Sequence, residues 1–137
     1  MTLTQPKPYF AVSKGLIKLL THTLTTQKID LSDAQTVIFN FRDPDYSPET
    51  GGFHPVEIGL TRDGDQWEFS YITDFAYVGY YNELGIELDF SFHLESAYQS
   101  GIGRFYGQPA KQLFRLWQAN FVEYVKSDIF TVNVTFY

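Results

Sequence analysis

The chain has 137 residues, of which 44% are hydrophobic and 18% aromatic, and this is enough to build one hydrophobic core without metals or disulfides. Ten basic and sixteen acidic residues give a formal net charge of -6, which disfavours binding to nucleic acid. The absence of cysteine excludes disulfides, thiolate metal sites and cysteine nucleophiles. We therefore expect a single domain over residues 1–137, with an ordered core from about residue 10 to residue 136.

The first predicted element is an amphipathic helix over residues 12–25, with Ser13 as a candidate cap. Its apolar residues recur at steps of three and four: Leu16, Leu19, Leu20 and Leu24. A polar connector follows. Residues 35–42 then alternate Val37, Phe39 and Phe41 with polar side chains, which is typical of a half-buried strand.

Residues 56–77 contain two alternating runs around Asp63-Gly64, a strong signal for a two-residue hairpin turn. A turn at these two residues pairs Leu60 with Trp67, Ile58 with Phe69 and Val56 with Tyr71, and puts all six on one face. That face continues through Thr73, Phe75 and Tyr77 and into a third run over residues 84–95. The third run keeps its apolar residues in phase: Leu84, Ile86, Leu88, Phe90, Phe92 and Leu94. The pattern predicts a three-stranded antiparallel meander.

The last third of the chain begins with a predicted loop over residues 96–110, rich in glycine and aromatic residues. A second helix is expected from Pro109 to about Ser127, and a final strand within residues 129–137. The inner face of that helix is assigned to Leu113, Leu116, Trp117, Phe121 and Tyr124. The element order α-β-β-β-β-α-β predicts an α+β domain, with a curved, mostly antiparallel sheet of about five strands and two helices on one face.

The predicted register places acidic side chains on the sheet face opposite the helices. The residues assigned to this face as candidate binding residues are Glu57, Glu68, Asp74, Glu87, Asp89 and His93. The default interpretation is a solvated face with ordinary carboxylates, and the alternative is a surface for a protein partner or a small cationic ligand. A divalent metal held by Glu57, Asp74, His93 and Glu95 is a further alternative. Alternation alone generates such spacing, so we assign no metal site and no cofactor.

Two loops are also candidates for contacts. In the first, "RDPDYSPETGGFHPVE" at residues 42–57, Pro48 and His54 stand where a calcium loop needs glycine and a closing glutamate. We therefore interpret this stretch as a rigid connection, in which His54 could border a pocket. In the second loop, Tyr98, Arg104 and Tyr106 flank a Gly-Ile-Gly segment and are candidates for stacking on a ligand or partner.

Three stretches carry a likeness to a known family: "FNFRDPDYSPETGGFHPVEI", "FSYITDFAYVG" and "LDFSF". Together they resemble a family of small uncharacterised proteins from gammaproteobacteria such as Vibrio and Shewanella, classed as a domain of unknown function. The resemblance spans about Phe10 to Phe136. It implies a bacterial, cytosolic, single-domain protein. It transfers no catalytic role to any residue.

The leading functional hypothesis is a noncatalytic binding or protein-interaction module that uses the acidic face or the aromatic loop. Self-association through the exposed edge of the final strand is one form of it. The alternative is a hydrolase or lyase in a cone-shaped α+β fold, with His54 or His93 as base and Glu57, Asp74 or Glu95 as acid partner. We assign no catalytic residue. A cavity in which a histidine and a carboxylate converge would favour the enzyme.

The cellular setting is predicted from the same residues. The N-terminal stretch lacks the uninterrupted apolar core of a signal peptide, and no segment approaches the length of a membrane span. We therefore expect a cytoplasmic protein with no membrane partner.

Overall fold

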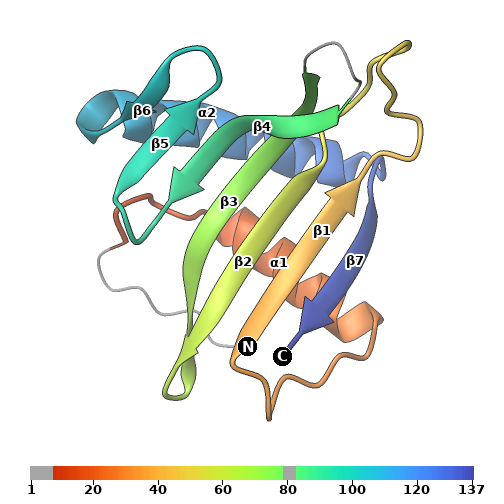
Figure 1. Cartoon of the computed structure of the whole chain (residues 1–137). Coiled ribbons are helices and arrows are strands. Elements are labelled where there is room, and N and C mark those ends of the chain that lie inside the picture. Colours follow the sequence, from red (N-terminus) through yellow and green to blue (C-terminus); the bar gives the residue numbers. More distant parts are fainter. Residues whose placement is uncertain (1–7, 79–82) are drawn as a thin grey trace.

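The computed structural model describes residues 8–78 and 83–137. In this part of the chain, seven strands form one antiparallel sheet in the order β6-β5-β4-β3-β2-β1-β7. Both helices lie on the same face of that sheet (Figure 1). The α+β class and the helices on one face are therefore confirmed, and the sheet has two strands more than expected.

The helices are α1, Lys14–Thr26, and α2, Gly107–Lys126. The first four strands are β1, Thr36–Arg42, β2, Val56–Asp63, β3, Gln66–Val78, and β4, Glu83–Ser91. The last three are β5, Ser96–Gln99, β6, Gly103–Phe105, and β7, Thr131–Phe136. Strands β6 and β7 form the two edges, so the prediction that the final strand lies at an edge is confirmed.

Helix α1 begins where the sequence predicts. The Ser13 hydroxyl accepts a hydrogen bond from the Leu16 amide and satisfies one of the free N–H groups of the first turn. The predicted leucine stripe faces the sheet, with Leu16, Leu20 and Leu24 buried. Local capping and periodicity were sufficient to define this element.

Helix α2 begins two residues earlier than predicted and presents a rotated face. Its buried residues are Ala110, Phe114, Trp117, Gln118, Phe121 and Val122. The assignment of Leu116 to the inner face is wrong, since it is exposed, and Tyr124 is only partly covered, although its ring contacts that of Phe53. Gln118 explains part of the rotation, because its buried amide donates to the Ala11 carbonyl and accepts from the Ser13 amide. A polar residue thereby occupies the inner stripe and links α2 to the start of α1.

The predicted loop over residues 96–110 contains the hairpin of β5 and β6. Ser91 pairs with Ser96 across a turn that holds His93 and Glu95, so these two residues do not lie in a strand. Gly101 and Gly103 then adopt φ of 82° and 100°, a left-handed backbone that suits glycine and closes the next turn. Strands of four and three residues are too short to show alternation. This explains why the sequence pattern did not reveal them.

The β2–β3 hairpin is correctly predicted, but its register is not. Asp63 pairs with Gln66, so the turn residues are Gly64 and Asp65, and Arg62 rather than Leu60 is paired with Trp67. Farther along, Leu60 pairs with Phe69 and Gly59 with Tyr71, which leaves Ser70 as the extra residue of a β-bulge. Successive side chains of a strand point to opposite faces of the sheet. The one extra residue therefore inverts the predicted face of every residue in β3 after Ser70.

This inversion changes which residues of β3 and β4 belong to the core. Ile72 and Asp74 point toward the helices, while Tyr71 and Phe75 belong to the other face. A second irregularity, between Asp74 and Phe75, leaves Glu87 unpaired in β4. Between Glu83 and Glu87, the side chains of β4 therefore also point to the face opposite the predicted one. The prediction that Leu84 and Ile86 are in phase with Leu88 and Phe90 is wrong, and they are 38% and 46% exposed.

A continuous apolar row forms the centre of the core. It crosses all seven strands in register: Val134, Phe39, Ile58, Ile72, Phe90, Ala97 and Phe105. Phe90 is fully buried and contacts the rings of Phe10, Phe114 and Trp117. One aromatic cluster thus joins the sheet, α2 and the segment that precedes α1.

Candidate functional site

A cavity of about 450 Å³ lies between the sheet and the C-terminal half of α2. Its floor is the row next to the apolar row, where Val56, Asp74, Leu88 and Gln99 pair across four strands. One wall comes from α2, and another from the segment that precedes β2. These walls contain Gly52, Phe53, His54, Leu113, Trp117, Asn120, Phe121 and Tyr124. The volume falls in the range of small-molecule sites, roughly 300–1,000 Å³.

The bulge at Ser70 brings Asp74 into this cavity. The bulge depends on Gly59, because the Tyr71 ring lies directly over that residue. A Cβ at Gly59 would lie 2.4 Å from Cε1 of Tyr71, so no larger residue fits without a shift. The Tyr71 hydroxyl in turn donates to Oε2 of Glu57 at 2.5 Å. Burial, followed by this hydrogen bond, raises the pKa of Tyr71 far above its ordinary value.

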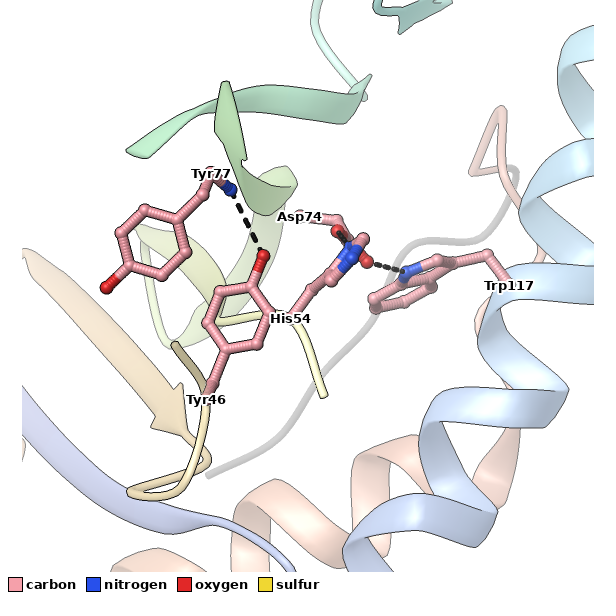
Figure 2. Close-up of polar contacts among 5 residues, drawn as sticks. All are labelled: Tyr46, His54, Asp74, Tyr77 and Trp117. Carbon is pink, nitrogen blue, oxygen red and sulfur yellow. Dashed lines mark hydrogen bonds and ion pairs between the residues drawn. The ribbon is translucent and has the colours of Figure 1, made fainter. Parts of the chain in front are cut away.

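The Asp74 carboxylate joins the two walls of the cavity (Figure 2). Its Oδ1 lies 2.7 Å from Nδ1 of His54, and its Oδ2 accepts a hydrogen bond from Nε1 of Trp117 at 3.0 Å. The Asp74 side chain is only 12% exposed, whereas that of His54 is 40% exposed. A buried carboxylate without donors would be costly, and here both oxygens have one.

The same contact sets the protonation of His54. The hydrogen bond to Asp74 raises the pKa of His54 above its ordinary value of 6.5, against the opposing effect of partial burial. The negative charges of Asp74 and Glu87 act in the same direction. In the neutral ring, donation from Nδ1 to Asp74 leaves the lone pair on Nε2. Nε2 has no hydrogen-bond partner in the described part of the chain.

The loop before β2 fixes the position of His54 through its own hydrogen bonds. The Asp43 carboxylate accepts from the amides of Asp45 and Phe53, and so ties both ends of the loop together. Gly52 has φ of 134°, and a Cβ there would lie 2.9 Å from Oδ2 of Asp43. These contacts agree with the interpretation of the stretch as a rigid connection. The loop does border a pocket, as the sequence suggested for His54.

Tyr46 ties the same loop to the end of β3. Its ring stacks on that of Tyr77 at 5.0 Å, and its hydroxyl accepts from the Tyr77 amide at 3.1 Å (Figure 2). The Tyr46 ring also lies 5.6 Å from the imidazole of His54. The imidazole is therefore bounded by a ring on one side and by the Asp74 carboxylate on another.

The predicted acidic face is divided by the structure. On the face away from the helices, one polar row crosses the sheet in register: Asn133, Asn40, Glu57, Thr73, Asp89, Tyr98 and Arg104. We call it the outer row. It brings together four of the predicted residues, namely Glu57, Asp89, Tyr98 and Arg104. The two carboxylates among them already have partners. Tyr71 donates to Glu57, Thr73 donates to Asp89, and Arg104 lies 3.7 Å from Asp89.

The other predicted residues lie elsewhere. Placing Asp74 and Glu87 on the outer face is wrong, because both line the cavity. Glu68 is exposed on the outer face near the hairpin turn, His93 is exposed in the β4–β5 turn, and Tyr106 precedes α2. The hypothetical metal cluster of Glu57, Asp74, His93 and Glu95 is therefore not assembled. Within residues 8–78 and 83–137, no three histidine or acidic side chains converge in a way that could hold a metal ion.

Sequence reasoning missed Trp117 and Asn120 as site residues. Trp117 was assigned to the core, and its burial agrees with that, but only its indole N–H reveals its contact with Asp74. Asn120 follows it by one helical turn and also faces the cavity. A polar residue within the apolar stripe of α2 was the one available signal.

Comparison with known proteins places the chain in a family. The family described as "Protein of unknown function (DUF2787)" matches residues 14–135. The chain belongs to DUF2787. The resemblance noted in the sequence is thus confirmed, and the family assigns no function. No curated protein matches the sequence.

Two solved structures that are similar to this chain come from Vibrio cholerae. A hypothetical protein of the VSP-II pathogenicity island is 38% identical, with a TM-score of 0.93 over 100% of this chain and 99% of that one. A conserved hypothetical protein of pathogenicity island VPI-2 is 37% identical, with a TM-score of 0.82 over 94% of this chain and 98% of that one. The latter is described as sharing structural homology with the human P32 protein. In the described part of this DUF2787 chain, neither helix is long and apolar enough to cross a membrane.

Proposed function

We propose that this protein binds a small organic molecule in the cavity between the sheet and α2. The observation that carries the proposal is the bridge from His54 through Asp74 to Trp117, at 2.7 Å and 3.0 Å. One buried carboxylate orients a polar group from the loop and an aromatic wall from the helix. Prearranged polar groups beside apolar and aromatic walls are typical of ligand sites.

The cavity is a better candidate than the outer row. In the outer row, Glu57 and Asp89 already accept hydrogen bonds from Tyr71 and Thr73. In the cavity, the amides of Asn120 and Gln99 have no side-chain hydrogen-bond partner among the described residues. These amides are therefore open to hydrogen bonds with a ligand that lies against the apolar walls.

The experiment is a fragment screen followed by nuclear magnetic resonance. We expect binding fragments to shift the indole N–H of Trp117 and the backbone amides of residues 52–54. His54→Ala and Asp74→Asn should weaken that binding. The matched control is His93→Ala, which removes an exposed histidine outside the cavity and should leave binding unchanged. Fragments that shift only residues of the outer row would overturn the proposal.

A hydrolase or lyase is the second candidate, and the free Nε2 of His54 is the observation that favours it. A histidine held through Nδ1 by a carboxylate can accept a proton at Nε2 from water or from a substrate. No serine, threonine or cysteine is among the described residues that line the cavity, and the role that the geometry favours is His54 as a general base. Turnover in a general substrate panel that is lost in His54→Ala, but kept in His93→Ala, would support it.

The cellular setting is part of the same proposal. A sequence of 137 residues without cysteine agrees with a reducing compartment, so we propose a cytoplasmic location. Fractionation of cells that express the tagged protein tests it, and recovery with the membrane or periplasmic fraction would contradict it.

A further inference from the structure

Glu87 places a second carboxylate in the cavity, and the hydrogen bonds among His54, Asp74 and Trp117 do not involve it. It is the extra residue of β4, since Asp74 pairs with Leu88 and Phe75 pairs with Ile86. In a bulge, two successive side chains can face the same side. Glu87 and Leu88 accordingly both line the cavity. The irregular backbone thus directs a carboxylate toward the helix side of the sheet.

The Glu87 carboxylate has no hydrogen-bond or ion-pair partner within residues 8–78 and 83–137. This distinguishes it from its neighbours in the sheet. Asp74 receives two hydrogen bonds, Asp89 contacts Thr73 and Arg104, and Glu57 accepts from Tyr71. Those carboxylates are satisfied inside the protein. Glu87 remains available to a ligand.

The charge of the cavity is negative in either protonation state of His54. The acidic groups that line it are Asp74 and Glu87, and His54 is its one basic group among the described lining residues. Protonated His54 balances Asp74 and leaves the charge of Glu87, whereas neutral His54 leaves both negative charges. An anionic ligand would be repelled, and a cation would be attracted.

The aromatic walls suit the same kind of ligand. Trp117 stacks on Phe121 with ring centroids 4.8 Å apart, and Phe53 contacts Tyr124 at 4.7 Å. All four rings line the cavity. Phe121 covers one face of Trp117, so these two rings offer mainly apolar surface for the hydrocarbon part of a ligand, whereas a face of Phe53 or Tyr124 that is open to the cavity can attract a cation.

We propose that the cavity selects an organic cation, with an ammonium group at Glu87 and an apolar or aromatic body against Trp117, Phe121 and Tyr124. This inference rests on the proposed ligand-binding function of the cavity and adds the class of ligand. The amides of Asn120 and Gln99 supply further hydrogen-bonding groups within the same cavity.

The test uses three probes of similar shape and different charge: 2-phenylethylammonium, 2-phenylethanol and 3-phenylpropanoate. Each is titrated into the full chain, and the Trp117 indole resonance reports binding. We expect the cation to bind about tenfold more tightly than the alcohol, and the carboxylate to bind most weakly. Added salt should reduce the preference for the cation.

Glu87→Gln keeps the size of the side chain and removes its charge. We expect it to lower the affinity for the cation to that for the alcohol, while the alcohol binds as before. Glu68→Gln is the matched control, because it makes the same change at an exposed position outside the cavity. Unchanged cation binding in Glu87→Gln would overturn the inference.

The probes also separate this inference from the proposed function. If the alcohol or the carboxylate shifts Trp117 as strongly as the cation does, the cavity binds ligands but does not select cations. If none of the three probes shifts Trp117, the selection of aromatic cations is refuted. A positive fragment screen would then still preserve the proposed function.

Discussion

The indole of Trp117 donates a hydrogen bond to the carboxylate of Asp74, and this contact joins α2 to β3 across 43 positions of the chain. The same carboxylate holds His54, so a single acidic side chain connects the helix, the sheet and the loop.

Trp117→Phe should destabilise the protein by about 1–3 kcal/mol beyond the loss of packing, because one Asp74 oxygen would lose its donor while buried. Chemical denaturation measures the free energy of unfolding. In an Asp74→Ala background the same change should cost less, since no carboxylate remains to be satisfied. Equal costs in the two backgrounds would show that the hydrogen bond does not stabilise the fold.

The contribution of His54 to stability should depend on pH in a defined direction. Its pKa is raised in the folded protein, mainly by the hydrogen bond to Asp74, so the folded state binds the proton more tightly. The stabilisation is fully present below the ordinary value of 6.5 and is lost as pH rises through the raised value. The difference in unfolding free energy between wild type and His54→Gln should therefore decrease from about pH 5 to about pH 9.

A titration of the His54 ring protons measures the same effect directly. The midpoint should lie above the ordinary value of 6.5, and Asp74→Asn should move it down. A His54 midpoint at or below 6.5 would contradict the assigned contact.

Gly59→Ala should destabilise the protein by about 1–3 kcal/mol, because its Cβ would overlap the Tyr71 ring. Tyr71→Ala should relieve part of that cost in the double variant, although it also removes the hydrogen bond to Glu57. Thermal and chemical denaturation of both single variants and the double variant measure the coupling. Additive costs would mean that Gly59 and Tyr71 do not determine the bulge together.

Phe90→Ala should cost about 3–5 kcal/mol, since it removes a fully buried ring from the centre of the core. Ile86→Ala provides the comparison in the same strand. Its side chain is 46% exposed on the inverted part of β4, and we expect a cost of about 0.5 kcal/mol or less. Similar losses at the two positions would contradict the inverted phase.

Several elements were predictable because their signals are local. The leucine spacing and Ser13 predicted α1, and strict alternation predicted the buried face of β1. The family resemblance was likewise readable from short stretches of sequence and was confirmed over residues 14–135. These features require only a few neighbouring residues.

The candidate site was not predictable in the same way, because it depends on two bulges. The sequence identified Asp74, Glu87 and His54 as candidates, but its uninterrupted alternation placed both acids on the outer face. A bulge shifts the pairing of every later residue by one position, and so inverts the face to which it points. The position of the bulge follows from contacts across strands, such as the Tyr71 ring over Gly59. The sequence by itself determined which residues could carry charge into a site. Tertiary packing decided which face they occupy, because pairing between strands, rather than the local pattern, determines the side to which each residue points.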